Sequence, residues 1–237
     1  MRILALDSTA TPASAAVAED GKLLGEFFIN TKQTHSQTLM PMVQQVLIQT
    51  KTSLEEIDLF AVSAGPGSFT GVRIGVACVK GMAFAQNKPC IGVSTLEAMA
   101  YPLSMLNGII CAVMDARCQQ VYHALFRVNG SKVERIYDDC AVAISDLAES
   151  LRQYSDETIY LVGDGAKLCY ESEAFQSLQV QLIAEHLQYQ RAVGVAQCAV
   201  MHLKQEACTV TAEQLAPVYL RLPQAERELK KKLEGTT

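Results

Sequence analysis

A glycine-rich segment, GPGSFTGVRIG at residues 65–75, has the residue types best suited to binding a ligand. It separates a strand-like apolar run from a helical pattern, so its backbone N–H groups and hydroxyls could face an anion at the positive end of the helix. It lacks the Gly-Lys-Ser/Thr ending of a phosphate-binding loop. A tight strand-to-helix turn, capped by Ser68 or Thr70, is the simpler interpretation and the one that the spacing favours. The segment alone therefore does not predict an ATPase.

Two aspartates, Asp7 and Asp115, end apolar strand-like runs and are candidates for metal-assisted phosphoryl transfer. Enzymes of that class follow such an Asp with glycine and with a basic or hydroxyl side chain that holds phosphate. Residues 8–13, STATPA, contain no glycine, Lys or Arg, so Asp7 is better interpreted as a cap or turn residue. Arg117 lies two residues after Asp115 and predicts a structural ion pair there.

A short turn, Gly163-Asp164-Gly165, follows another apolar run. It fits an adenosine-binding turn, although Asp-Gly is also the commonest plain turn. Together with the two aspartates and the glycine-rich segment, it predicts a degenerate nucleotide cleft without a complete catalytic set. The candidate residues of this cleft are Asp7, Ser8, Gly67, Ser68, Asp115, Arg117, Gly163 and Gly165.

Neither the histidines nor the cysteines have the spacing of a metal site. A helix that grips a metal needs two His four residues apart, and Leu39 occupies that place after His35. The other three histidines are isolated and are predicted to be surface or hydrogen-bonded residues. The 8 cysteines contain no C-x-x-C pair and indicate buried free thiols in a reducing compartment. We therefore expect no metal, no other cofactor and a cytoplasmic protein.

Length and charge limit the class of protein. The chain has 237 residues, 49% of them hydrophobic, which is enough for one large or two small domains with a full core. No stretch approaches the roughly 20 apolar residues of a membrane span, and the strand-like start does not resemble a secretion signal. A net charge of -5 disfavours a protein that holds nucleic acid by itself. Any contact with nucleic acid is expected to be indirect, through a partner.

Apolar periodicity predicts an α/β chain in which strands alternate with helices. Three strands open the chain, and the same order begins again after Asn107-Gly108. The predicted strands are 2–7, 13–19, 22–28, 59–64, 90–93, 109–114, 121–128, 132–136 and 159–162, and the predicted helices are 36–50, 72–86, one from near 94, one from about 144 and 193–204.

The repeated order indicates an internal duplication, and hence two similar domains that meet at a cleft. Each domain is expected to hold a mixed sheet flanked by helices. We predict an N-terminal domain over residues 1–106, in which helices 36–50 and 72–86 are expected to contact a partner, and a C-terminal domain over residues 107–222. Residues 223–237 are predicted to be a charged, solvated tail, for which a nucleic-acid contact is the less favoured alternative.

The predicted helix 72–86 is apolar around most of its circumference and must be covered on more than one side. One side is expected to face the sheet, and small residues on the other side would let a foreign helix approach. Met40, Met42 and Ile48 widen the apolar arc of helix 36–50 in the same way. The alternative is a helix pair buried wholly within the monomer. The predicted dimer and partner interface consists of Leu39, Met42, Val46, Gly71, Val72, Gly75, Cys78, Val79 and Met82.

Six segments together carry a resemblance to a known family. They are ILALDST at 3–9, HSQTLMPMV at 35–43, GPGSFTGVRIG at 65–75, IGVSTL at 91–96, DAR at 115–117 and APVYLR at 216–221. The glycine-rich segment is the most specific of them. From residue 1 to about residue 222, the chain resembles the bacterial TsaB family, also called YeaZ.

The resemblance implies a duplicated actin/Hsp70/sugar-kinase-like fold. It also implies a partnership with TsaD, a paralogue that transfers the threonylcarbamoyl group to adenosine 37 of tRNA, and with the ATPase TsaE. In that family TsaB is a non-catalytic scaffold and activator. A homodimer when alone and a heterodimer with TsaD, both formed by the helix pair 36–50 and 72–86, are therefore implied, with tRNA contacted only indirectly.

An enzyme is the competing function. The alternatives are a metal-dependent glycopeptidase, as the family was once labelled, and a small-molecule kinase of the actin-like class. The missing second histidine and the incomplete phosphate-binding loops favour the non-catalytic partner over both.

Overall fold

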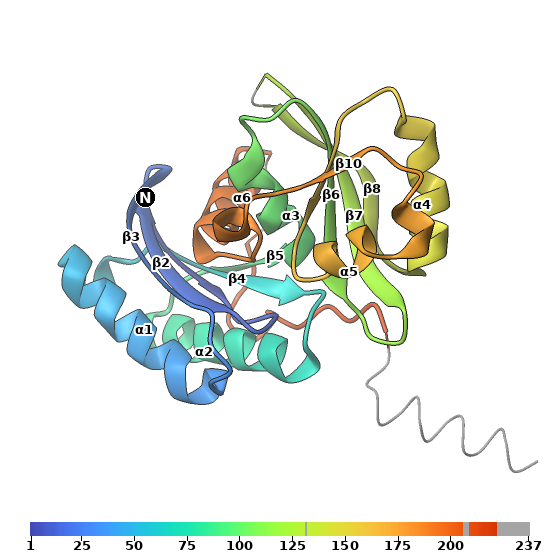
Figure 1. The fold of residues 1–237 in the computed structure, drawn as a ribbon. Coiled ribbons are helices and arrows are strands. Elements are labelled where there is room, and N and C mark those ends of the chain that lie inside the picture. Colours follow the sequence, from blue (N-terminus) through green and yellow to red (C-terminus); the bar gives the residue numbers. More distant parts are fainter. Residues whose placement is uncertain (131, 206–208, 222–237) are drawn as a thin grey trace, which may run out of the picture.

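The computed structural model describes residues 1–130, 132–205 and 209–221, and it contains two lobes that are each built on a five-stranded sheet (Figure 1). The first lobe consists of β1 (Arg2–Asp7), β2 (Ala13–Glu19), β3 (Lys22–Ile29), α1 (His35–Thr50), β4 (Leu59–Gly65), α2 (Phe69–Gln86) and β5 (Cys90–Ser94). The second lobe consists of β6 (Gly108–Asp115), β7 (Gln120–Asn129), β8 (Lys132–Ala143), α4 (Ile144–Leu151), β9 (Ile159–Val162), α5 (Ala166–Tyr170) and β10 (Val180–Leu182). Two further helices, α3 (Thr95–Ala100) and α6 (Ala192–Lys204), pack on the inner faces of the sheets.

The two sheets have the same topology. The strand order is β3-β2-β1-β4-β5 in the first sheet and β8-β7-β6-β9-β10 in the second. In both, the first three strands of the lobe pair antiparallel and the last two join in parallel. The internal duplication predicted from the sequence is thereby confirmed.

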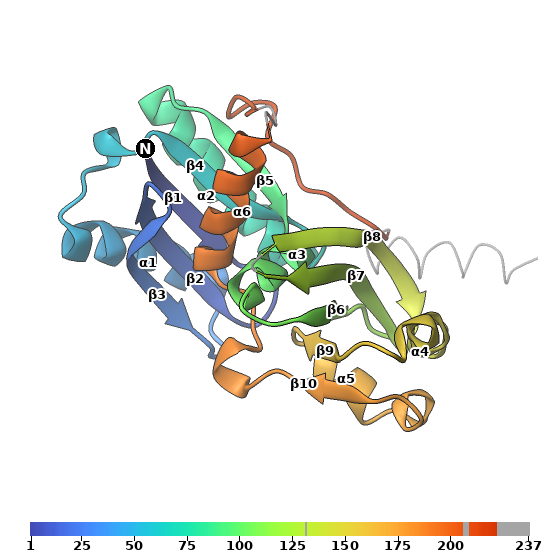
Figure 2. The same ribbon diagram turned by 90° about the horizontal axis from the view of Figure 1, so that it is seen from above.

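Helices cover each sheet on both faces (Figures 1 and 2). Helices α1 and α2 cover the face of the first sheet opposite α6, and α4 and α5 cover the face of the second sheet opposite α3. Helix α6 packs on the inner face of the first sheet, while α3 packs against the inner face of the second. Because α3 lies between the lobes and contacts β6 and β7, it joins them into one packed body.

Strand β1 is covered by helices on both faces, which explains why its sequence is apolar without alternation. Leu4 and Leu6 point into the core beneath α1 and α2, whereas Ile3 and Ala5 point toward α6. A strand that is covered on both faces needs apolar side chains at every position. The central strands therefore read as continuous hydrophobic runs.

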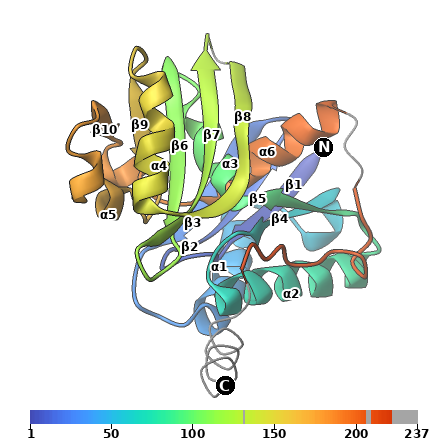
Figure 3. The same cartoon turned by 90° about the vertical axis from the view of Figure 1, so that its right-hand side faces the viewer.

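The chain returns to the first lobe after the second sheet is complete. Helix α6 packs on β1 and β2. Residues 209–221, which we call the strap, then run beside α2 (Figure 3). Helix α6 and the strap belong to the predicted C-terminal domain, yet they pack on the first lobe. The domain limits 1–106 and 107–222 stay predictions. The predicted tail, 223–237, lies outside the described residues.

The predicted strands and helices are present with ends that differ by a few residues, except that β8 continues to Ala143 and α3 is short. Helix α5 and strand β10 were not predicted, because five and three residues are too few to show a period. None of the described helices is long and apolar enough to cross a membrane.

The residues predicted to form the partner interface are mostly inside the chain's own core. The side chains that are buried between the helices and the first sheet are Leu39, Met42, Val46, Val72, Val79 and Met82. Gly71 and Gly75 are buried as well, and both pack against Ser8. These eight positions therefore present no open surface on the chain, whereas Cys78 is half-buried, and their role in an interface stays a prediction. The sequence of an apolar helix shows that the helix is covered on more than one side, but it does not show which side packs on the sheet.

Candidate functional site

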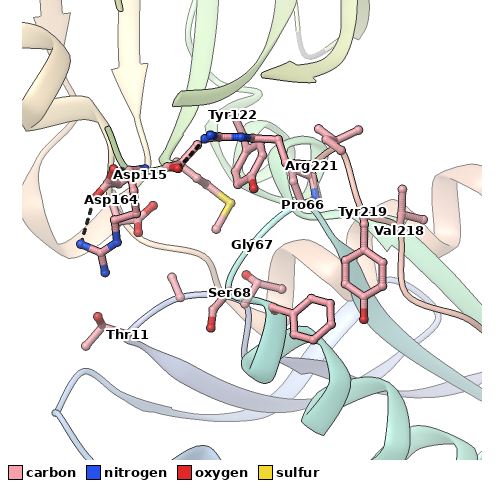
Figure 4. Close-up of a pocket in the computed structure, with 17 residues that line it drawn as sticks. Thr11, Pro66, Gly67, Ser68, Asp115, Tyr122, Asp164, Val218, Tyr219 and Arg221 are labelled. Atoms are coloured by element: carbon pink, nitrogen blue, oxygen red, sulfur yellow. Dashed lines mark hydrogen bonds and ion pairs between the residues drawn. The ribbon is translucent and has the colours of Figure 1, made fainter. Parts of the chain in front are cut away.

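A cavity of about 370 Å³ lies in the cleft between the two lobes (Figure 4). It is formed where the carboxyl ends of the central strands β1, β4, β6 and β9 approach one another, which is the usual ligand position in open α/β sheets. The walls are Thr9–Thr11, Pro66–Phe69, Met114–Arg117, Tyr122, Asp164 and Val218–Arg221.

Asp7 ends β1 but does not line the cavity. Its side chain is 1% exposed, and Oδ1 accepts hydrogen bonds from the backbone N–H and the hydroxyl of Thr9, at 3.0 and 2.9 Å. Burial raises the pKa of the Asp7 carboxyl. The neighbouring Ser8 is turned toward α2 and donates to the Gly71 carbonyl at 2.9 Å. Asp7 is thus the turn residue that the sequence predicted.

The loop between β4 and α2 is packed against the β1–β2 loop. The backbone N–H of Ser68 donates to the Thr9 carbonyl at 2.7 Å, and its hydroxyl accepts from the N–H of Gly71 at 3.4 Å, which caps the helix. A side chain at residue 67 would meet the backbone of Thr9, so only glycine fits there. The prediction of a tight, serine-capped turn is confirmed. Ser68 and Gly67 nevertheless face the cavity.

The acidic side of the cavity is built by Asp115 and Asp164, which lie near each other in Figure 4. Asp115 accepts a hydrogen bond from the backbone N–H of Arg117 at 2.7 Å and pairs with its guanidinium at 3.3 Å. The structural ion pair predicted for these two residues is confirmed. Asp164 accepts from the side-chain amide of Gln190 at 3.3 Å. Burial, with a smaller contribution from the charge of Asp115, raises the pKa of Asp164 to about 6.

The strap closes the opposite side of the cavity. The N–H of Val218 donates to the Ala64 carbonyl at 2.7 Å, next to Gly65, where any Cβ would collide with Val218. The Tyr219 ring packs against Phe69 at 4.8 Å between centroids, and its hydroxyl accepts from Arg73 at 2.7 Å. The strap therefore holds the first turns of α2, the helix whose amino end faces the cavity.

Comparisons with known proteins match this chain to TsaD and to TsaB proteins. A family model described as TsaD, tRNA N6-adenosine threonylcarbamoyltransferase, matches residues 22–229. The tRNA threonylcarbamoyladenosine biosynthesis protein TsaB of Bacillus subtilis is 30% identical over 95% of this chain and 96% of its own length. The TsaB of Escherichia coli is 38% identical over 70% of this chain and 72% of its own length. The chain belongs to the TsaB family.

The structure agrees with this assignment. YeaZ from Pseudomonas aeruginosa is 26% identical to this chain, has a TM-score of 0.77, and the match covers 92% of this chain and 99% of that one. The fold is the duplicated actin-like fold that the resemblance implied, with two mixed sheets flanked by helices.

In this TsaB-family cleft, half of the predicted residues line the cavity. Gly67, Ser68, Asp115 and Arg117 do so. The other four do not: Asp7, Ser8, Gly163 and Gly165. Both glycines of the second turn instead lie against the backbone of β6, where Gly163 has a φ of 110° and only glycine fits. They position the residue between them rather than a ligand.

Sequence reasoning missed several cavity residues, namely Thr9, Thr11, Tyr122, Asp164, Tyr219 and Arg221. A signal existed for Asp164, which sits inside the Gly-Asp-Gly turn, and for the last two, which belong to the APVYLR segment of the TsaB resemblance. Arg221 reaches the cavity from a position 105 residues away from its partner Ala116. No local pattern reports such a contact.

The described histidines that contact other groups do so as hydrogen-bonding residues. His35 contacts the Ala10 carbonyl at 2.6 Å, His202 contacts Glu97 at 3.0 Å, and His123 contacts the Cys140 thiol at 3.0 Å. Over residues 1–130, 132–205 and 209–221, no group of three His, Cys, Asp or Glu side chains is arranged to hold a metal ion. Apart from the exposed Cys118, the described cysteines are buried or half-buried free thiols.

Proposed function

We propose that this chain is a non-catalytic subunit in the synthesis of threonylcarbamoyladenosine in tRNA. In this proposal it binds a TsaD-family transferase and is needed, with the ATPase TsaE, for transfer of the threonylcarbamoyl group to adenosine 37. The names of its TsaB relatives support the process. The match to the TsaD family model supports a partner with the same fold, because related folds can meet through equivalent elements.

The observation that carries the proposal is an exposed apolar surface on the outer side of α1 and α2, which we call the outer face. Phe84 is 71% exposed, Ile48 is 55% exposed and Met40 is 43% exposed. Three small residues of α2 are exposed as well: Ala77, Gly81 and Ala85. Soluble chains rarely leave such a surface open unless a partner covers it.

The small residues on α2 suit a close helix–helix contact. A Cβ added at Gly81 would meet no atom within 4 Å, so the space over this residue is free for a foreign side chain. Phe84, one turn further along, provides the large aromatic anchor that often dominates the energy of an interface. The same surface on a second copy would give a two-fold contact. We therefore propose that the homodimer and the complex with TsaD use the outer face and compete for it.

The geometry of the cleft supports a non-catalytic role. Asp7, at the position of a phosphoryl-transfer carboxylate, does not line the cavity and is held through Oδ1 by Thr9. Asp115 is engaged by Arg117. Of these two carboxylates only Asp115 lines the cavity, so the pair is not placed toward a common ligand.

Gly81→Glu tests the contact, because it adds a charge to the outer face without touching the core. We expect the variant to fold, and to lose at least about tenfold in affinity for TsaD and in self-association, since an unpaired charge would be buried. Tyr170→Glu, at an exposed position on α5 of the second lobe, is the matched control. Sedimentation velocity measures the homodimer, calorimetric titration measures TsaD binding, and circular dichroism checks folding. A folded Gly81→Glu protein with unchanged affinities would refute the proposed surface.

A reconstituted reaction tests the non-catalytic role separately. TsaD, TsaE, tRNA, ATP and threonylcarbamoyl adenylate are mixed with this chain, and each component is omitted in turn. We expect modified tRNA only when this chain, TsaD and TsaE are all present. The isolated chain is expected neither to hydrolyse ATP nor to cleave glycoproteins, and steady turnover in a preparation free of TsaD and TsaE would contradict the proposal.

A further inference from the structure

The turn between β6 and β7 has an unusual backbone. Three consecutive residues without glycine adopt the left-handed conformation: Arg117, Cys118 and Gln119, with φ angles of 66, 55 and 55°. Such a conformation is unfavourable for each L-residue, and it normally occurs at single positions only. All three side chains are exposed, so packing of these side chains in a core does not enforce the conformation. Strain of this kind persists only where surrounding contacts impose it.

Two contacts from the cleft hold it, in addition to the backbone hydrogen bonds of the hairpin itself. Asp115 accepts a hydrogen bond from the N–H of Arg117 at 2.7 Å, which fixes the entry to the turn. Arg221 of the strap donates to the carbonyl of Ala116 at 2.6 Å, from the other side of the cavity mouth. The turn itself is closed by a hydrogen bond from the N–H of Gln120 to the Arg117 carbonyl at 3.2 Å.

The strap is attached unequally along its length. Its first part is anchored by the buried Ala212 and Leu215 and by Lys80, which donates to two of its carbonyls at 3.0 Å. Its last four residues have no buried side chain, since Val218 is 52% exposed and Tyr219 is 41% exposed, and they are held by surface contacts with the start of α2 and with Ala64. The bond from Arg221 to the second lobe lies at the end of this more exposed part (Figure 4).

We propose that the end of the strap and the left-handed turn form a coupled switch at the mouth of the cleft. When Arg221 bonds Ala116, the turn is held in its strained form and the strap closes one wall of the cavity. When the bond breaks, the turn relaxes out of the left-handed conformation and the wall opens. The two segments thus change state together, since each is held in place partly by the other. This inference concerns the second lobe and does not depend on the proposed partner surface.

Arg221→Ala in the full chain tests the switch, with amide hydrogen exchange followed by NMR. We expect the amides of Arg117, Gln120 and Ile144, all bonded within or to the turn, to exchange about tenfold faster, because a charged hydrogen bond to the turn is lost. Arg152→Ala, at an exposed ion pair beside α4, is the control and is expected to leave these rates unchanged. If Arg221→Ala does not fold, Arg221→Lys, which keeps the charge but not the donor geometry, replaces it with the same expected direction.

A glycine background distinguishes strain from simple loss of a bond. Cys118→Gly together with Gln119→Gly removes the cost of the left-handed conformation without removing buried contacts. In that background Arg221→Ala is expected to change the exchange rates at least about threefold less than in the parent, because a relaxed turn no longer needs to be held. Unchanged exchange in Arg221→Ala, or an effect of the same size in the glycine background, would overturn the proposal.

Discussion

Replacing Asp164 with Asn is expected to stabilise the protein at neutral pH. Burial raises the pKa of Asp164 from the ordinary value of 3.8 to about 6, so the folded state binds its proton more tightly than the unfolded chain does. Stability therefore falls as the pH rises from about 4 to about 6, and the full cost of the charged carboxylate is present above that range. The pKa difference corresponds to about 3 kcal/mol. Because the side chain is partly accessible from the cavity, we expect a measured gain of about 1–2 kcal/mol.

The substitution is close to isosteric. Asn retains the oxygen that accepts a hydrogen bond from Gln190, and it removes the repulsion between Asp164 and Asp115. Urea unfolding at pH 7.5 and at pH 4 gives the free energies of unfolding of parent and variant. We expect the gain at pH 7.5 and almost none at pH 4, where the parent carboxyl is already protonated. Asp156→Asn, at an exposed position in the same lobe, controls for the loss of one negative charge.

The pH dependence decides the outcome. A gain of equal size at both pH values would show that the amide packs better rather than that the charge is costly. No gain at pH 7.5 would show that the carboxylate is adequately solvated or paired, and the electrostatic description of the cleft would then be refuted.

Three further predictions concern the core and its titration. Leu39→Ala should lower the free energy of unfolding, measured in urea, by about 2–5 kcal/mol, because the side chain is fully buried. The folded fraction should keep its affinity for TsaD. A selective loss of that affinity would contradict the placement of Leu39 in the core. Gly75→Ala should cost about 1–3 kcal/mol by the same measurement, because the new Cβ would lie 2.7 Å from the hydroxyl of Ser8; an unchanged stability would show that α2 can shift outward freely. Burial lowers the pKa of His123 from 6.5 to about 4, so the folded state takes up this proton less readily and its stability should fall by up to about 3 kcal/mol as the pH drops from 6.5 to 4. A His123→Leu protein that loses stability over this range as steeply as the parent would disprove that last contribution.

Local sequence determined the elements and several contacts in this protein. The period of the apolar residues defined most strands and helices, and the repeated order of three strands followed by alternating elements identified the duplication. Ser68 as a helix cap and the ion pair between Asp115 and Arg117 were predictable, since their partners lie two or three residues away. Interactions of such short range depend on residue type and spacing, which the sequence contains directly.

Only the tertiary structure decided which surfaces are free and which residues share the cleft. Helix α2 is apolar around most of its circumference, so its sequence is compatible with either side facing the sheet. In the structure Gly71 and Gly75 pack against Ser8, and this packing leaves Gly81 and Phe84 on the exposed side. The contact of Arg221 with Ala116 and the cover of the first sheet by α6 join segments more than 100 residues apart in the chain. Such contacts depend on how whole elements pack, and that packing is set by the shape and volume of many side chains at once.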